Sequence, residues 1–280
     1  DAAAIPAFAR KYRVSCNLCH NPFPALTAFG EQFAGNGFRM AIDEEPRDTI
    51  ATGDDLLTLP AGVPLALRLD AYAQLYSDGK AATDFQLPFN LKLLSGGTLG
   101  KKLSYYIYFL LAERGEVAGI EDAFIYWNDI AGAPVDLAVG QFQVSDPIFK
   151  RELRLEVLDY AIYKVLVGRQ PANLTYDRGL MASADVAGFT FTASLVNGDG
   201  IPAANEMFRY DNDANKNLFG HLTHDLGKHA RLGLMGYTGR QDGEVYGFPG
   251  QDNAVTMWGA DATFGTGPVQ LNLQYVGRTD

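Results

Sequence analysis

Residues 65–76 read LALRLDAYAQLY, and this stretch decides the fold. Leucine or alanine stands at every odd position from 65 to 75, whereas Arg68 and Asp70 are among the side chains at even positions. Successive side chains of a β-strand point to opposite faces, so the alternation predicts a strand with one apolar and one charged face. Residues 84–93 repeat the pattern, with Phe85 and three leucines opposite Lys92 and other polar residues.

The rest of the chain predicts nine further strands. They cover residues 102–113, 120–129, 134–143, 178–185, 188–196, 217–226, 229–239, 253–264 and 268–278. The 30 glycines, 14 tyrosines and 17 phenylalanines also suit strands and turns better than helices. Because no apolar run reaches the ~20 residues of a membrane-spanning helix, any membrane crossing is expected to be made by strands.

The connections between the later strands alternate in length. The short ones are 130–133, 186–187, 227–228 and 265–267, after an earlier short one at 95–101, and the long ones are 144–177, 197–216 and 240–252. A soluble sandwich also has alternating strands, but long strands with short turns at one end and long loops at the other are typical of outer-membrane barrels. We therefore expect a mainly β protein, with a transmembrane antiparallel β-barrel over residues 65–280.

The first strand of this barrel would begin at the short-turn, periplasmic end. Residues 1–45 are then expected in the periplasm or inside the barrel, joined by a linker at residues 46–64. Eleven strands is an odd number, whereas bacterial single-chain barrels have even numbers. The sequence is therefore expected to be incomplete at its C-terminus, or to hold one strand more than the pattern shows.

The most specific chemical signal lies in residues 15–20, which read SCNLCH. Cys16 and Cys19 are the only cysteines of the chain, and their spacing, followed directly by His20, is that of a c-type haem attachment site. A structural zinc ion needs four ligands, and the other histidines lie about two hundred residues away. A thioredoxin-like pair would need a βαβ unit, which does not follow here. We expect one covalent haem c, with His20 as an axial ligand of its iron.

A short helix is predicted after this motif, ending at the Gly35-Asn36-Gly37 run. Its aromatic residues fall on one face, which would line the haem. The predicted pocket residues are Phe23, Leu26, Phe29 and Phe33. A module of this size buries little surface alone, so the haem and a docking partner are expected to supply much of its core.

The sixth ligand of the iron is predicted to be Met40, which follows the helix and would give the His/Met ligation that raises a haem potential. Three alternatives among the side chains stay open, namely His221, His224 and His229, and so does an exchangeable water. His221 and His229 share the predicted polar face of their strands, so they are also candidates for pore lining.

Charge and the N-terminus indicate a location. The net charge of −10 and the lack of a basic block argue against a nucleic-acid partner. The first residues, DAAA, are typical of a mature chain left after signal-peptide cleavage. Covalent haem attachment in bacteria takes place outside the cytoplasm, so the N-terminus and the haem motif agree. With the barrel pattern, they predict the bacterial outer membrane, with its lipid around the strands.

The N-terminal region resembles that of fused monohaem cytochrome–porins of bacterial outer membranes, a family that includes proposed ferrous-iron oxidases. The resemblance rests on IPAFAR at 5–10, CNLCH at 16–20, FPAL at 23–26 and Phe29-Gly30. The barrel is similar to phosphate-selective porins in VGQF at 139–142, DRGL at 177–180 and VNGDG at 196–200.

The second resemblance implies about sixteen strands in the complete barrel. It also implies that the connection 144–177, which contains the charged run 150–154, folds inward as a constriction, the alternative being a solvated external loop. The lysine and arginine clusters of a phosphate pore are not evident in this sequence. Their absence from the sequence argues against phosphate selectivity and does not change the predicted fold.

Together these features predict electron transfer at the outer membrane, either as a pure carrier or as a one-electron, iron-oxidase-like enzyme. The expected partners are periplasmic cytochromes or another redox protein, and extracellular metal ions such as Fe²⁺. The resemblance implies a homotrimer or a subunit of a larger complex. One alternative is a solute channel in which the haem is structural or gating, and another is a gas sensor or peroxidase with an open iron position.

Overall fold

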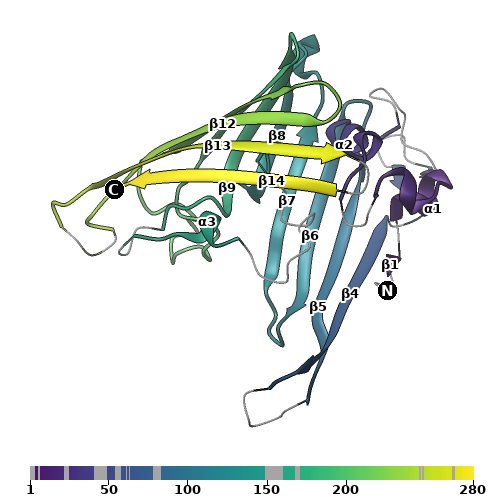
Figure 1. Cartoon of the computed structure of the whole chain (residues 1–280), viewed down its shortest axis with the longest axis horizontal. Coiled ribbons are helices and arrows are strands. Elements are labelled where there is room, and N and C mark those ends of the chain that lie inside the picture. The colour runs from purple at the N-terminus through teal and green to yellow at the C-terminus, as the bar shows by residue number, and fades with distance from the viewer. Residues whose placement is uncertain are drawn as a thin grey trace. The chain divides into compact units, whose positions relative to one another are not determined.

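The structure is a computed structural model of the chain, shown in Figure 1. It describes residues 4–5, 7–21, 25–40, 49–53, 58–60, 62, 64–77, 83–148, 160–167, 171–245, 247, 249–266 and 269–280. The predicted pocket residue Phe23 and the charged run 150–154 lie outside these ranges. The chain divides into two compact units: Asp1–Asn21 with Leu26–Tyr126, and Pro22–Ala25 with Trp127–Asp280.

The first unit joins a small helical part to four long strands. Its first elements are β1 (Ala4–Ile5), α1 (Ala7–Tyr12), the 3₁₀ turn η1 (Cys16–Leu18) and α2 (Ala28–Gly35). The long strands are β4 (Leu65–Leu75), β5 (Thr83–Thr98), β6 (Leu103–Glu113) and β7 (Gly119–Trp127). They follow one another in chain order, and β1 pairs with the outer side of β4. A small ladder of β2 (Thr49–Ala51) and β3 (Thr58–Pro60) lies within the predicted linker.

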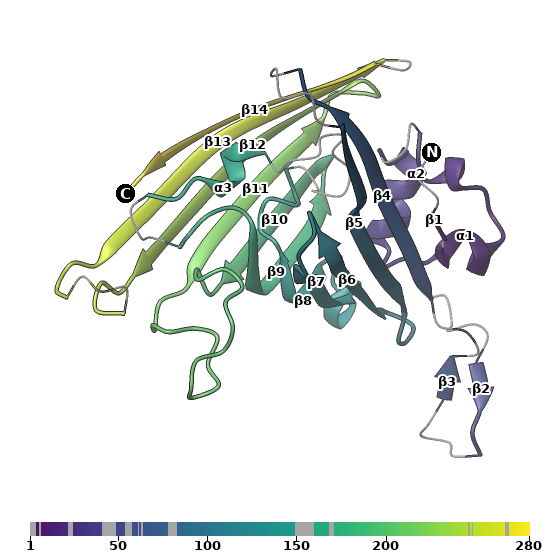
Figure 2. The same cartoon turned by 90° about the horizontal axis from the view of Figure 1, so that it is seen from below.

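The second unit is a sheet of seven strands in chain order. Its elements are η2 (Ile130–Gly132), β8 (Asp136–Gln143), α3 (Ala161–Lys164), β9 (Tyr176–Val186), β10 (Phe189–Val196), β11 (Asn217–Asp225), β12 (Ala230–Gln241), β13 (Asn253–Thr266) and β14 (Val269–Thr279). Each strand pairs antiparallel with the next, and Figure 2 shows β11 to β14 side by side.

All eleven predicted strands are present, so the expectation of a mainly β, antiparallel fold is confirmed. In the part of the chain that the structure describes, the pairing does not close into a barrel, and β14 pairs with β13 alone. The closed barrel therefore stays a prediction. None of the helices in the described residues is long and apolar enough to cross a membrane.

The two faces of the strands differ as the alternation predicted. In the first unit, Arg68 Nε lies 2.8 Å and Lys92 Nζ 3.9 Å from the carboxylate of Asp70, so these three charges share one face. The opposite face is apolar and exposed, with Leu75 and Phe85 among its side chains. In the second unit the exposed apolar side chains include Phe191, Leu195, Leu218, Leu234, Trp258, Leu271, Leu273 and Tyr275.

The polar face of the second unit is partly covered by the long connection between β8 and β9. The Tyr163 hydroxyl, on α3, donates a hydrogen bond to Gln274 Oε1 on β14. Arg278 Nη1 donates to the carbonyl oxygens of Val165, at 2.7 Å, and Ala172, at 2.8 Å. The described part of this connection thus packs on the polar face of β14, and the constriction that the resemblance implied stays a prediction.

Candidate haem-attachment site

The two cysteines and the adjacent histidine lie on one tight turn. The backbone N–H groups of Cys19 and His20 both donate to the Cys16 carbonyl oxygen, at 3.2 and 3.0 Å. Ser15 begins the turn, because its Oγ accepts a hydrogen bond from the Asn17 N–H at 3.4 Å. The local hydrogen bonds of η1 therefore bring the thiols and the imidazole into one short loop, as the motif predicted.

Thr27 fixes this loop to the start of α2. Its N–H donates to the Cys19 carbonyl oxygen at 2.9 Å, and its Oγ1 donates to the Leu18 carbonyl oxygen at 2.6 Å. The same Oγ1 accepts from the Gly30 N–H at 3.1 Å, which caps the helix. A β-bridge between His20 and Leu26 adds a further link. One residue thus sets both the helix start and the shape of the cysteine loop.

Gly30 allows α2 to approach the loop closely. A Cβ atom at this position would lie 2.3 Å from the Cys19 carbonyl oxygen, well inside van der Waals contact. Glycine has no side chain and avoids this overlap. Any larger residue would push the helix away from the turn that presents the second thiol.

Both thiols are free to react. Cys16 is exposed and Cys19 is half-buried, and neither takes part in a disulfide. Burial, and then the nearby charge of Cys16, raise the pKa of the Cys19 thiol. Within the described residues, no group of three or more His, Cys, Asp or Glu side chains is placed to hold a metal ion. Two free thiols beside one histidine fit the donor set that covalent haem attachment requires.

Aromatic rings fill the core of the module behind the loop. Phe33 is only 6% exposed, and its ring centroid lies 5.2 Å from that of Phe8 and 5.6 Å from that of Tyr12. Phe38 stacks on Phe8 at 5.1 Å, and the half-buried Phe29 lies 6.5 Å from Phe33. Of the predicted pocket residues, Phe29 and Phe33 are thus brought together. Phe8, Tyr12 and Phe38 were not predicted, although the four-residue spacing of the first two on α1 was a usable signal.

The aromatic core continues onto the long strands of the first unit. Phe38 stacks on Tyr106 at 5.0 Å, and Tyr106 lies 5.5 Å from Phe124 on β7. Tyr106 pairs with Gly96, four residues along β5 from Lys92, so the rings lie on the polar face of the strands. Side chains of the strands therefore contribute to the core of the module, a role that we expected a docking partner to have.

Two arginines anchor the module at a defined end of these strands. Arg10 Nη2 donates to the carbonyl oxygen of Leu65, the first residue of β4, at 2.8 Å. The fully buried Arg39 donates to the carbonyl oxygens of Gly100 and Lys101, in the short β5–β6 turn. Figures 1 and 2 both show α1 and α2 beside β4. The module thus contacts the end of the strands where β4 begins and the β5–β6 turn lies, and its place in the periplasm or inside a barrel stays a prediction.

The predicted sixth ligand of the iron lies in the first unit, and the alternative histidines lie in the second. Met40 follows α2 and its side chain is 36% exposed. In the second unit, His221 is 5% exposed and its Nε2 lies 2.8 Å from Asp261 Oδ2. His224 Nδ1 and His229 Nδ1 lie 2.7 and 2.9 Å from backbone carbonyl oxygens. His221 is buried, whereas His229, which was predicted on the same polar face, is exposed.

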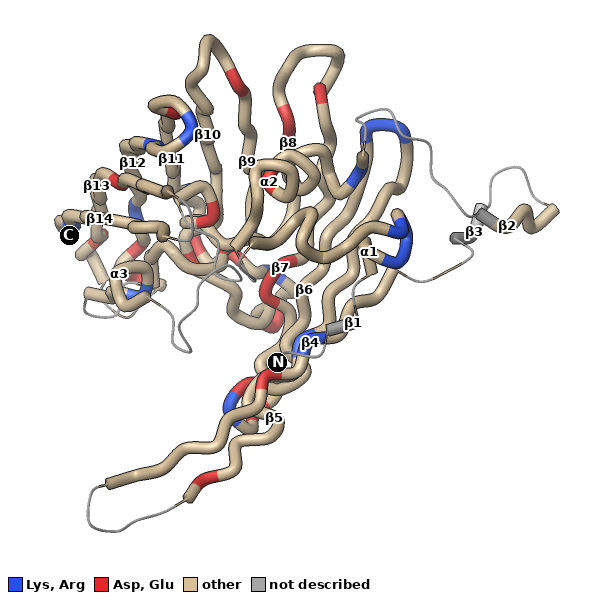
Figure 3. Tube along the Cα trace, turned by 45° about the vertical axis from the view of Figure 1, so that its right-hand side comes forward, with Lys and Arg blue, Asp and Glu red and all other residues tan. Residues whose placement is uncertain are grey.

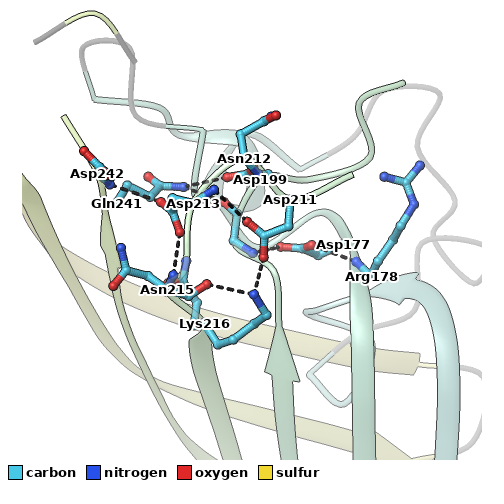
Figure 4. Close-up of polar contacts among 12 residues, drawn as sticks. Asp177, Arg178, Asp199, Asp211, Asn212, Asp213, Asn215, Lys216, Gln241 and Asp242 are labelled. Carbon is cyan, nitrogen blue, oxygen red and sulfur yellow. Dashed lines mark hydrogen bonds and ion pairs between the residues drawn. The ribbon is translucent and has the colours of Figure 1, made fainter. Parts of the chain in front are cut away.

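A second polar network lies in the second unit (Figure 4) and includes residues of the DRGL and VNGDG segments, to which the sequence analysis assigned no site. Asp177 Oδ2 accepts from the Gly198 N–H at 2.9 Å, and Asp199 Oδ2 accepts from the Asn212 N–H at 3.2 Å. Asp213 Oδ2 accepts from the Asp242 N–H at 3.1 Å. These carboxylates are used to hold the backbone of the two long connections after β10 and β12, which is the ordinary turn chemistry of aspartate.

Comparison with models of protein families finds none that matches this chain, and comparison with curated proteins finds no match.

Proposed function

We propose that this protein transfers single electrons at the bacterial outer membrane through one c-type haem bound at Cys16, Cys19 and His20. The observation that carries the proposal is the presentation of these three residues on one turn, with both thiols free. A disulfide would remove the thiols from any attachment chemistry. The tight turn instead keeps both available beside a histidine.

Each residue of the site has a separate task in this proposal. Cys16 and Cys19 would each form one thioether bond with a haem vinyl group, and His20 would supply one nitrogen to the iron. The haem supplies the one-electron redox step when it is bound. Thr27 and Gly30 hold the loop against α2, and the aromatic core around Phe33 keeps that helix in place.

The strands β4–β14 are proposed to be part of a porin-like barrel of about sixteen strands, surrounded by outer-membrane lipid. The exposed apolar face and the polar opposite face support this. The contact between the module and the short-turn end supports a haem on the periplasmic side or inside the barrel. This is the arrangement implied by the resemblance to fused cytochrome–porins, with periplasmic cytochromes and extracellular iron as the proposed partners.

The test is stopped-flow spectroscopy of the purified haem-containing protein. The oxidised protein is mixed with Fe²⁺, and separately with a reduced periplasmic cytochrome, while the haem absorption is followed. Electron exchange with at least one of them is expected within seconds. If neither exchanges electrons with the haem, electron transfer as the function is refuted.

The sixth ligand is tested by the absorption spectrum. If Met40 binds the iron, the oxidised protein shows the weak band at the red edge of the visible spectrum that marks a Met–iron bond. The substitution Met40→Ala should abolish this band, and His229→Ala should leave it unchanged. An identical spectrum for wild type and Met40→Ala would contradict the assignment.

A solute channel is the second candidate function, favoured by the charged face of β4 and β5. Arg68, Asp70 and Lys92 would line a wet lumen, where such charges select ions. Conductance across planar bilayers separates the two proposals. Ion transport that survives unchanged in the Cys16→Ala/Cys19→Ala variant would favour the channel.

A further inference from the structure

The exposed apolar face of the second unit is not flat along β13. Ala260 and Ala262 stand on this face, and their cross-strand partners on both neighbouring strands are bulky apolar residues. These partners are Leu232 and Leu234 on β12, and Leu273 and Tyr275 on β14. All four are between 42% and 61% exposed. The two alanines thus form the floor of a groove, and the four larger side chains form its walls.

The groove has a measurable volume and a defined end. The six residues take part in the lining of a hollow of about 610 Å³. On the same face of β13, Trp258 pairs with Gly277, and a Cβ atom at Gly277 would lie 3.0 Å from the indole ring. Glycine therefore leaves room for Trp258, whose ring centroid lies 5.2 Å from that of Tyr275. These two rings close one end, and the next bulky side chain on this face of β13 is Phe264, roughly 20 Å along the strand.

The width of the groove limits what can occupy it. Adjacent strands lie about 5 Å apart, so the backbones of β12 and β14 are separated by roughly 10 Å, and their side chains narrow the space further. An α-helix with its side chains is about 10–12 Å wide and does not fit. The acyl chains of one lipid leaflet extend over about 15 Å, half of a hydrocarbon core. A single extended acyl chain therefore matches the groove in width, length and polarity.

The Phe264 end of the groove lies next to the turn between β11 and β12, residues 226–229. Gly265 follows Phe264 and joins β13 to this turn. Its N–H donates to the His229 carbonyl oxygen at 2.9 Å, and its own carbonyl oxygen lies 2.9 Å from His229 Nδ1. The turn therefore has a fixed place at the end of the groove.

This turn carries a positive charge. It reads LGKH, and Lys228 is exposed and has no carboxylate beside it within the turn. The nearby Asp225 carboxylate is paired with Arg231 Nε at 2.6 Å. Figure 3 shows basic residues in blue in the segment that joins β11 to β12. A negatively charged group at this end of the groove would complement the charge of Lys228.

We propose that the hollow formed by Leu232, Leu234, Ala260, Ala262, Leu273 and Tyr275, here termed the β13 groove, binds one acyl chain of a phospholipid whose phosphate contacts Lys228. The setting rests on the proposed function, which surrounds these strands with outer-membrane lipid. The inference goes beyond that setting, because it assigns one lipid molecule to one site. A lipid that binds only the folded chain would also stabilise the second unit.

The test is native mass spectrometry of the purified haem-containing protein in detergent, titrated with dioleoyl-phosphatidylglycerol. The wild type should retain one lipid at concentrations at which further lipids are not bound. Ala260→Leu/Ala262→Leu fills the floor of the groove and should weaken this binding by about tenfold, because the acyl chain loses its apolar contacts. Ala193→Leu makes the same change at an exposed alanine of β10 outside the groove and should bind lipid like the wild type.

Lys228→Ala tests the headgroup contact separately. Dioleoylglycerol has the same acyl chains without the phosphate, and it should bind the wild type about threefold more weakly than the phospholipid, as expected for an exposed charge pair. In Lys228→Ala the two lipids should bind equally. Because Lys228 is exposed in a turn, this variant also tests the site if the groove-filling variant does not fold.

Three results would overturn the β13 groove. They are equal lipid affinity in the wild type and Ala260→Leu/Ala262→Leu, equal weakening in Ala193→Leu, and a second copy of the chain bound in place of the lipid. Detergent phase separation keeps this inference distinct from the proposed function. A chain that stays in the aqueous phase refutes the membrane setting and the groove with it. A chain that enters the detergent phase and fails the lipid test refutes the groove alone.

Discussion

The cysteine turn in the first unit and the buried face around His221 in the second unit both contain residues able to bind a cofactor. In the cysteine turn, the hydrogen bonds described involve backbone groups and the side chains of Ser15 and Thr27, and the two thiols take part in no disulfide. Around His221, polar side chains bond to one another, as in the His221–Asp261 contact and the 2.7 Å hydrogen bond from Asn217 Nδ2 to the Tyr237 hydroxyl. Polar side chains that hydrogen-bond to one another contribute to stability. Thiols that are left available for reaction indicate a chemical role.

The largest effect should come from removing the thiols. Cys16→Ala/Cys19→Ala is expected to abolish covalently bound haem completely, because no other residue of this chain can form a thioether with it. Haem staining after denaturing electrophoresis measures this. The control variant His221→Ala/His229→Ala removes two histidines of the second unit that could bind iron but cannot form a thioether. This variant should retain the covalent haem. If the cysteine variant still carries covalent haem and its circular dichroism is unchanged, the cysteine turn is not the attachment site and the contrast between the two regions fails.

The next effect is expected from the aromatic core that supports the turn. Phe33→Ala removes a buried ring with four aromatic neighbours and should lower the free energy of unfolding by about 3–5 kcal/mol. Urea denaturation followed by the haem absorption is the measurement. Phe85→Ala, at a ring that is 80% exposed, serves as the matched control and should change stability by less than about 0.5 kcal/mol. Similar losses of unfolding free energy in the two variants would show that this aromatic core does not stabilise the module.

A smaller effect is expected in the second unit. His221→Ala leaves the carboxylate of Asp261 without its 2.8 Å partner in a buried setting, which should cost about 1–3 kcal/mol of unfolding free energy. Arg231→Ala breaks the exposed pair with Asp225 and should cost less than about 1 kcal/mol. Thermal unfolding followed by circular dichroism compares them. A change of the haem spectrum in His221→Ala would instead show that this histidine binds the iron.

The smallest effect concerns the pH dependence of thiol reactivity in the chain without the proposed haem. Because burial raises the pKa of Cys19, its reactive thiolate should form at a higher pH than that of an ordinary exposed cysteine. Alkylation of Cys19 by iodoacetamide, measured by peptide mass spectrometry from pH 6 to about pH 10, should therefore reach half its maximal rate at a raised pH. A midpoint at or below the ordinary value would show that Cys19 is not desolvated by the loop.

The strands were predictable because their signal is local. Alternation with period two needs only neighbouring residues, and it located β4 to within one residue and β9, predicted at 178–185, to within two. The cysteine motif was predictable for the same reason. The ladder of β2 and β3 was missed because three-residue strands are too short to show a period.

The supporting contacts of the site were not predictable from the sequence alone. Arg39 stands between Phe38 and Met40, directly after a glycine-rich run, and this local sequence gives no sign that it would be completely buried against carbonyl oxygens about sixty residues away. The Phe38–Tyr106 stack is equally remote in sequence. Such contacts depend on how the module meets the strands, and a local pattern does not contain that information.

The burial of Arg39 limits how the N-terminal module can be transplanted. Moving residues 1–45 alone onto another scaffold would leave behind the carbonyl groups of Gly100 and Lys101, and the guanidinium would lose these hydrogen bonds. The ring of Tyr106 would be lost in the same cut. The N-terminal module is therefore not portable as residues 1–40 alone: it needs at least the β5–β6 hairpin, residues 83–113, and the start of β4, where Arg10 and β1 bind.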